Sequence, residues 1–173
     1  VIEPGARAAL RASGTRRIGV VGTLGTVTSG AYERAIHALD EDVYVIARAC
    51  PLFVPFVEEG WQDHPAIDLV ASEYLTPLRG TGIDTLVLGC THYPLLKSVI
   101  ARAIGPDIRM IDSAEETAGE VARVLADRGL RHPPRDDAPT HRFIASDVPE
   151  QFRNVGTRFL GAAIDHVETV TLG

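Results

Sequence analysis

The sequence predicts an α/β protein built on a parallel sheet, and two patterns carry this prediction. Short apolar runs rich in β-branched residues recur at 18–21, 43–47, 85–88 and 108–111. The segments between them have mostly helical spacing, and strands that alternate with helices form parallel sheets covered on their faces. The composition agrees, because 45% of the 173 residues are hydrophobic and 23% are charged, as in globular domains.

Each strand is expected to lead into a helix whose ends carry capping residues. We expect these helices over about 31–39, from Asp63 to Gly80, over 95–104, and from Ser113 to Arg128. Ser29, Asp63 and Ser113 are the expected N-caps, the last with Glu116 at capping-box spacing. Pro94 fits the first position of the third helix, and Gly129 fits the end of the fourth.

The pattern changes beyond Gly129. Residues 131–139 are rich in proline and charge, which is typical of an exposed connection. A strand near Phe143, a helix opened by Asp147 and Pro149, and a strand over 167–172 follow it. There is no internal repeat.

Charge and hydropathy exclude several classes of partner. The net charge is −6 and no basic run is longer than Arg16–Arg17, so the sequence offers no stripe that neutralises the phosphates of a nucleic acid. No apolar stretch approaches the roughly 18 to 20 residues that span a bilayer. The first residues also lack the basic, apolar and small-residue regions of a secretory signal peptide. We therefore expect a soluble, cytoplasmic protein with no nucleic-acid or membrane partner.

Cys90 is the main candidate for chemistry. The run Gly89-Cys90-Thr91-His92 follows the most apolar strand, and ligands of open parallel sheets bind at the carboxyl ends of the strands. A cysteine just before a helix is exposed to unpaired backbone N–H groups, which favour the thiolate, and His92 can exchange protons near neutral pH. From spacing alone, a small buried cysteine beside a surface histidine is an equally good interpretation.

Metal binding and a second thiol are less favoured. A zinc site needs three or four protein ligands, and the local run supplies only Cys90 and His92, so we expect no metal. Cys50 precedes Pro51 at the end of another strand, where a small core residue is the favoured interpretation.

Three other segments have a functional and a structural interpretation. Glu58 follows an apolar run and could orient His92 from a partly dry pocket, although a solvated acidic turn with Glu59 as competitor explains it equally well. The turn Gly22–Gly25 could hold an anion with its N–H groups, but it lacks a complete phosphate-binding fingerprint. The segment Asp112–Thr117 is most simply a helix cap.

The run Leu86-Val87-Leu88-Gly89-Cys90-Thr91-His92-Tyr93-Pro94-Leu95-Leu96 resembles the second catalytic-cysteine motif of glutamate racemases. Other segments resemble parts of that family in the same order, namely Val1–Gly5, Ile18–Thr23, Cys50–Pro55 with Glu58, and Ile111–Thr117. The likeness extends from Val1 to the last expected strand.

The resemblance implies a cofactor-independent interconversion of L- and D-glutamate that supplies D-glutamate for peptidoglycan. In this family two thiols on opposite faces of the α-carbon act in turn, one removing the proton and the other returning one. The resemblance assigns one of these thiols to Cys90, assistance to His92, the orientation of His92 to Glu58, and substrate contacts to Thr91 and His92. It implies no cofactor, and it allows a homodimer.

The sequence also departs from the family pattern. The Asp-Ser-Gly motif and the first catalytic cysteine, which lie in about the first third of a typical member, do not occur here. By analogy, residues 1–111 form the complete second lobe, a flavodoxin-like parallel-sheet sandwich, and 112–173 form the returning part of the first lobe. The alternatives are a racemase-like binding module without activity, or a racemase for aspartate or hydantoin, which the Cys-Thr-His-Tyr-Pro run makes less favoured.

Overall fold

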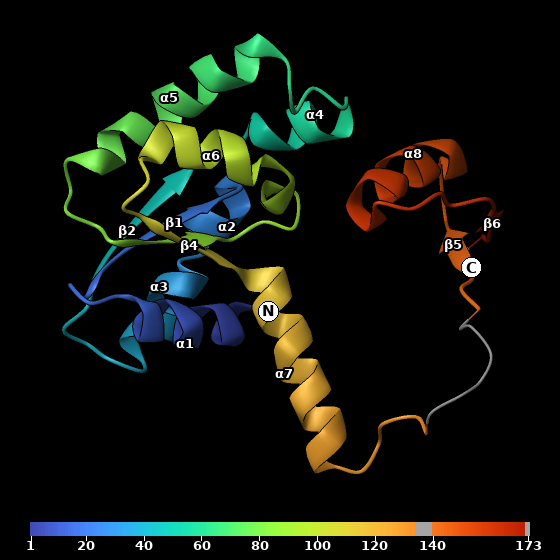
Figure 1. The fold of residues 1–173 in the computed structure, drawn as a ribbon, viewed down its shortest axis with the longest axis horizontal. Helices are drawn as coiled ribbons and strands as arrows, with labels where there is room; N and C mark the ends of the chain where they lie inside the picture. Colours follow the sequence, from blue (N-terminus) through green and yellow to red (C-terminus); the bar gives the residue numbers. More distant parts are fainter. Residues whose placement is uncertain (134–139, 172–173) are drawn as a thin grey trace. The chain divides into compact units, whose positions relative to one another are not determined.

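The computed structural model describes residues 1–133 and 140–171. It divides into two compact units, Val1–Arg131 and His132–Gly173, which are coloured along the sequence in Figure 1. The first unit holds every residue proposed above for chemistry. Among the described residues, no helix is both long enough and apolar enough to span a membrane.

A four-stranded parallel sheet forms the centre of the first unit. Its strands are β1 (Arg17–Gly22), β2 (Tyr44–Ala49), β3 (Thr85–Leu88) and β4 (Arg109–Asp112), in the order β2-β1-β3-β4. All three neighbouring pairs are parallel, and Val21 at the end of β1 lies opposite Leu88 at the end of β3. This is the beginning of the flavodoxin-like order, in which ligands bind where the order reverses, between β1 and β3. The predicted α/β class and parallel sheet are confirmed.

Helices cover both faces of this sheet (Figure 1). One face carries α4 (Phe53–Glu58), α5 (Pro65–Arg79), the 3-10 helix η1 (Tyr93–Leu96) and α6 (Lys97–Ile104). The other face carries α1 (Ile2–Ala12) and α3 (Ala31–His37). Successive residues of a strand face opposite sides, so Val87 enters the core under α1 and α3, whereas Leu86 and Leu88 enter the core under α5 and α6.

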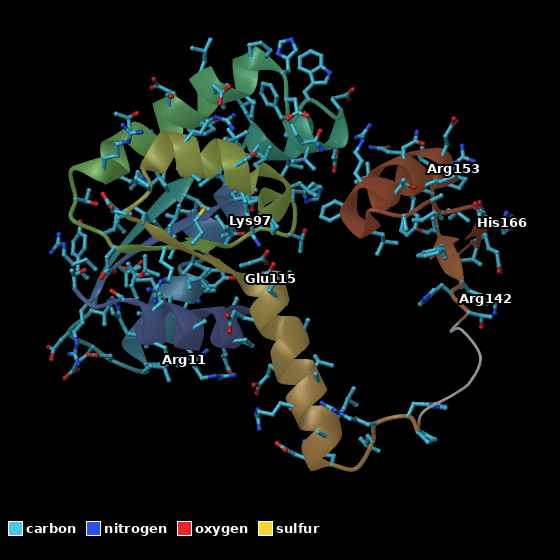
Figure 2. All side chains as sticks on the ribbon, in the orientation of Figure 1. Arg11, Lys97, Glu115, Arg142, Arg153 and His166 are labelled. Carbon is cyan, nitrogen blue, oxygen red and sulfur yellow. The ribbon has the colours of Figure 1, made fainter. Side chains whose placement is uncertain are left out.

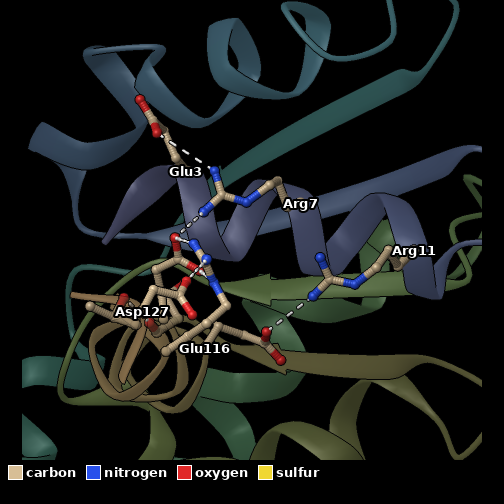
Figure 3. Close-up of polar contacts among 9 residues, drawn as sticks. Glu3, Arg7, Arg11, Glu116 and Asp127 are labelled. Carbon is tan, nitrogen blue, oxygen red and sulfur yellow. Dashed lines mark hydrogen bonds and ion pairs between the residues drawn. The ribbon is translucent and has the colours of Figure 1, made fainter. Parts of the chain in front are cut away.

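Helix α7 (Ser113–Asp127) begins directly after β4 and packs along α1. At its first turn, Lys97 of α6 and Glu115 of α7 lie side by side (Figure 2). Further along, Arg7 pairs with Glu120 at 3.4 Å and Arg11 pairs with Glu116 at 3.3 Å (Figure 3). These two ion pairs join the first half of α7 to α1.

The elements depart from the sequence predictions mainly at helix starts. The short helix α2 (Leu24–Thr28) and α4 were expected as connections. The N-cap of α5 is His64 rather than Asp63, because the His64 Nδ1 atom accepts the Ala66 N–H at 3.2 Å. The N-cap of α7 is Asp112 rather than Ser113, because its carboxylate accepts two backbone N–H groups.

Two further helix starts differ. Gly30, with a φ of 59°, precedes α3 in place of Ser29, which instead ends α2. Pro94 lies in η1, and the α-helix begins only at Lys97. The Cys90 loop therefore runs into a single 3-10 turn before regular helix begins.

The second unit contains β5 (Phe143–Ala145), α8 (Pro149–Leu160) and β6 (Val167–Thr169). The two strands pair in parallel, with Phe143 opposite Val167, so α8 is the crossover between them. The last strand is shorter than the expected 167–172, and residue 172 and residues 134–139 of the expected connection lie outside the described residues. The lobe boundary expected between 111 and 112 stays a prediction, since α7 belongs to the first compact unit.

Candidate active site

The backbones of β1 and β3 come into close contact where both strands end. The Gly89 N–H donates to the Val21 carbonyl oxygen at 2.7 Å. A Cβ at Gly89 would lie 3.0 Å from that oxygen and 3.0 Å from Cε2 of Tyr32. Only glycine fits there without displacement, and this contact places Cys90, the next residue, at the point where the strand order reverses.

Cys90, His92 and Glu58 form a continuous polar row. The Cys90 Sγ atom lies 4.0 Å from His92 Nδ1, and His92 Nε2 lies 3.2 Å from Glu58 Oε1. Thr91 Oγ1 is 3.3 Å from the same Nδ1 atom. The three side chains that sequence reasoning named around Cys90 are thus brought together.

Glu58 reaches His92 because it is the last residue of α4. Phe53 and Val57 of that helix are fully buried, which anchors the helix against the core. The Glu58 side chain is 39% exposed and that of His92 is 22% exposed, so the pair is partly withdrawn from water. Glu59 instead forms the C-cap of α4. The arrangement has the contact that an orienting role of Glu58 requires.

The structure changes the expected protonation of Cys90. Burial raises the pKa of the Cys90 thiol, while hydrogen bonds from the backbone N–H groups of His92 and Tyr93 lower it, and the net direction is upward. The backbone N–H groups that follow Cys90 favour the thiolate, as the sequence predicted, but burial of the thiol outweighs them. A neighbouring base must therefore take the thiol proton.

Cys50 is a core residue, as the sequence favoured. Its side chain is fully buried, and its thiol approaches the Arg48 carbonyl oxygen at 3.7 Å. Burial raises the pKa of Cys50 to about 12. This thiol is neither accessible nor ionised near neutral pH.

Tyr93 helps to position the Cys90 loop, a role that the sequence did not indicate. Its hydroxyl donates to the Cys50 carbonyl oxygen at 2.8 Å, and its ring meets Phe53 edge to face at 5.2 Å. It therefore fastens the Cys90 loop to the end of β2. A tyrosine one residue after His92, in an otherwise apolar helix start, was the available signal.

The other candidate segments have structural roles. Thr23 caps α2, and its Oγ1 atom accepts the Thr26 N–H at 3.2 Å, so the turn after β1 already uses part of its hydrogen-bonding capacity. Asp112 caps α7 as described above. Within the part of the chain that the structure describes, no group of three or more His, Cys, Asp or Glu side chains is placed to hold a metal ion.

Known proteins similar to this chain are glutamate racemases. A glutamate racemase of Geobacter metallireducens is 51% identical over 172 residues, which cover 99% of this chain and 63% of that protein. A glutamate racemase of Neisseria meningitidis is 50% identical over the whole chain and 63% of its own length. The chain therefore spans about 63% of the length of these curated relatives.

Solved structures give the same result. The glutamate racemase isoform RacE1 of Bacillus anthracis superposes with a TM-score of 0.89 at 41% identity, over 99% of this chain and 63% of that one. The glutamate racemase of Francisella tularensis, solved in complex with D-glutamate, superposes with a TM-score of 0.88 at 33% identity, over 98% and 62%. Residues 1–121 match the family model described as Asp/Glu/Hydantoin racemase. This chain belongs to the Asp/Glu/hydantoin racemase family.

Proposed function

We propose that this chain carries one of the two acid–base thiols of a cofactor-independent glutamate racemase, and that the reaction supplies D-glutamate for peptidoglycan. The observation that carries the proposal is the row Cys90–His92–Glu58 at the carboxyl end of the sheet. It rests also on the relatives named glutamate racemase and on the solved relative that holds D-glutamate.

The row suits proton transfer at a carbon atom. His92 Nδ1 faces the thiol and Nε2 faces Glu58, so a neutral ring with its proton on Nε2 donates to the carboxylate and accepts from Cys90. The thiolate then removes the α-proton of glutamate, and the electron pair of the C–H bond delocalises into the α-carboxylate. A second thiol on the opposite face donates its proton to the carbon, which inverts the centre.

Thr91 and His92 are the proposed substrate contacts in this chain. The Thr91 hydroxyl lies beside the ring of His92 and its residue is exposed, so it can reach a molecule bound over Cys90. Glu58 then acts through His92 as a positioning residue. The row uses no cofactor.

The second thiol is proposed to lie outside these 173 residues. Cys50, the other cysteine of the chain, is fully buried and cannot serve. An apolar hollow of about 510 Å³ borders Thr91 and lies on α7, where Val121 and Leu125 are exposed. We propose that residues 112–173 belong to the first lobe of the longer enzyme and that its remaining segments cover this hollow, while 1–111 form the second lobe.

The test is exchange of the α-proton of D- and L-glutamate in heavy water, followed by NMR. The 173-residue chain and its Cys90→Ala variant are compared. Exchange of one enantiomer only, lost in the variant, supports Cys90 as a working base that lacks its partner. Exchange with full racemisation would contradict the proposed absence of a second thiol. If the longer protein with an intact Cys90 exchanges neither enantiomer, the racemase proposal fails.

Two alternatives make different predictions in the same assay. A racemase-like binding module, which the coverage of only 63% of the relatives keeps in view, would bind glutamate without exchanging its proton. A racemase for aspartate would exchange aspartate faster than glutamate. The expected result is exchange of glutamate in preference to aspartate and hydantoins.

A further inference from the structure

The first turn of α7 is bonded to the end of the segment that carries Cys90, and through Tyr32 of α3 it also contacts the beginning of that segment. We call residues 89–97 the Cys90 segment. Its two attachments end on neighbouring residues, Asp112 and Ser113, which are 6% and 3% exposed. Asp112 is bonded to Lys97 of the segment itself, whereas Ser113 is bonded to Tyr32 of α3, whose ring lies against Gly89. These two residues therefore do more than cap a helix.

The first attachment is made by Lys97, at the end of the segment. Its Nζ atom lies 2.8 Å from Asp112 Oδ2 and 2.8 Å from Glu115 Oε1, and Figure 2 shows Lys97 and Glu115 adjacent. The other oxygen of Asp112 accepts the N–H groups of Ala114 and Glu115. One buried carboxylate thus joins the start of α6 to the start of α7.

The second attachment is indirect and is made by Tyr32 of α3, whose ring lies against Gly89 at the beginning of the segment. The Tyr32 hydroxyl donates to Ser113 Oγ at 2.8 Å, and the residue is only 4% exposed. Its ring fits between two glycines, because a Cβ at Gly89 would lie 3.0 Å from Cε2 and a Cβ at Gly5 would lie 3.4 Å from Cε1. The ring therefore lies against the residue just before Cys90, and the bond of its hydroxyl to Ser113 keeps the ring in that position.

Helix α7 also packs against α1, and this contact supports its first turn. The pairs Arg7–Glu120 and Arg11–Glu116 join the first half of the helix to α1 (Figure 3).

We propose that Tyr32, Ser113, Lys97 and Asp112 are positioning residues that hold the Cys90 thiol in its half-buried place through the first turn of α7. The proposal rests on the proposed function for its catalytic meaning, but the position of the thiol can be measured without any activity. In the longer enzyme, α7 would then link the reacting thiol to the proposed first lobe.

If the Cys90 segment is released, the pKa of the Cys90 thiol is expected to fall. Burial is the largest influence on the Cys90 thiol, and it raises the pKa. The titratable groups near this thiol include His92 on the segment itself, Tyr32 on α3 and Tyr93 on η1. If the attachments are cut, the thiol gains water, its pKa falls, and it becomes more accessible, so its reaction with an alkylating reagent accelerates.

The experiment measures iodoacetamide labelling of Cys90 and Cys50 against pH by peptide mass spectrometry. Lys97→Met is compared with Arg102→Met. Arg102 lies on the same helix and forms an exposed ion pair with Asp68, which this variant removes. Tyr32→Phe is compared with Tyr44→Phe, because Tyr44 is the first residue of β2 and the Cys90 site lies at the other end of the sheet. We expect Lys97→Met and Tyr32→Phe each to label Cys90 at least about threefold faster at pH 8, which corresponds to a fall of about half a unit in pKa. The two controls should match the unmodified chain.

Cys50 distinguishes positioning from loss of stability. It is fully buried, so its labelling reports opening of the whole core. Faster labelling of Cys90 alone supports the proposal. Unchanged labelling, slower labelling, or a parallel rise at Cys50 would overturn it. If the unmodified longer protein does not exchange the α-proton of glutamate, the proposed function is overturned, but the labelling result still tests the position of the thiol.

Discussion

The His92 Nε2 atom lies 3.2 Å from Glu58 Oε1, although 34 residues separate the two in sequence. The contact exists because the short helix α4 ends beside the loop that follows β3. It places the carboxylate beside the histidine from a different strand-to-helix connection. The orienting role of Glu58 depends on this contact and stays a prediction.

Replacing Glu58 with glutamine tests that role. The amide keeps the shape but loses the charge that favours the Nε2–H tautomer of His92, so the α-proton exchange of glutamate should slow by about tenfold or more. The control is Glu59→Gln, since Glu59 only caps α4, and it should leave exchange unchanged. Equal effects of the two substitutions would show that the acidic turn acts through general charge.

Replacing Gly89 with alanine tests the close contact of β1 and β3. The added Cβ would lie 3.0 Å from the Val21 carbonyl oxygen, a backbone atom that cannot rotate away. We expect a loss of about 1–3 kcal/mol in the free energy of unfolding, measured by urea titration. Gly80→Ala is the matched control, because nothing lies within 4 Å of its added Cβ. A neutral Gly89→Ala variant would mean that the strand ends separate easily.

Asp84 predicts a dependence of stability on pH. Burial raises its pKa, but hydrogen bonds from Ser13, Thr15 and Thr85 outweigh burial and lower the pKa to about 2. The unfolded value is about 3.9, so the contribution is present above that pH and is lost as pH falls through about 4 towards 2.

The Asp84→Asn variant should therefore be less stable at pH 7 and lose less stability between pH 5 and pH 3 than the unmodified chain. Urea midpoints at the three pH values measure both effects. Asp107→Asn, at an exposed position, serves as the control and should keep the original slope. A parallel slope in Asp84→Asn would assign the acid sensitivity to other carboxylates.

Tyr93→Phe tests the attachment of the Cys90 loop to β2. The ring keeps its edge-to-face contact with Phe53, but the bond to the Cys50 carbonyl oxygen is lost. That oxygen still accepts the Phe53 N–H at 3.2 Å, so the cost should be about 1 kcal/mol in thermal or urea unfolding. Tyr44→Phe, on the exposed side of β2, should cost less than half as much. A cost of zero would assign the loop's position to packing alone.

The periodic features of the sequence predicted the sheet, because buried parallel strands are continuous apolar runs that few other structures produce. All four strands of the first unit lie where these runs occur. The short helices α2 and α4 were missed, since five or six residues give too few turns for a helical period.

The candidate site was predicted in part for a related reason. Cys90, Thr91 and His92 are neighbours in sequence, and Glu58 came from its unusual apolar surroundings. Tyr32, Ser113 and Lys97 were not singled out for the site, because each acts through a tertiary contact that leaves no local pattern. Ser113 was noted only as a cap, and its hydroxyl turns instead towards Tyr32.

The paired glycines at the ends of β1 and β3 restrict how this pocket can diversify. A Cβ at Gly22 would meet Cγ2 of Thr26 at 2.9 Å, and one at Gly89 would meet backbone. A larger residue at either position would collide with its neighbours, so both positions are restricted to glycine. Substitutions that change what the proposed site binds are therefore expected at side chains around it, such as Thr91, and mutagenesis there should be more productive than mutagenesis of positions 22 and 89.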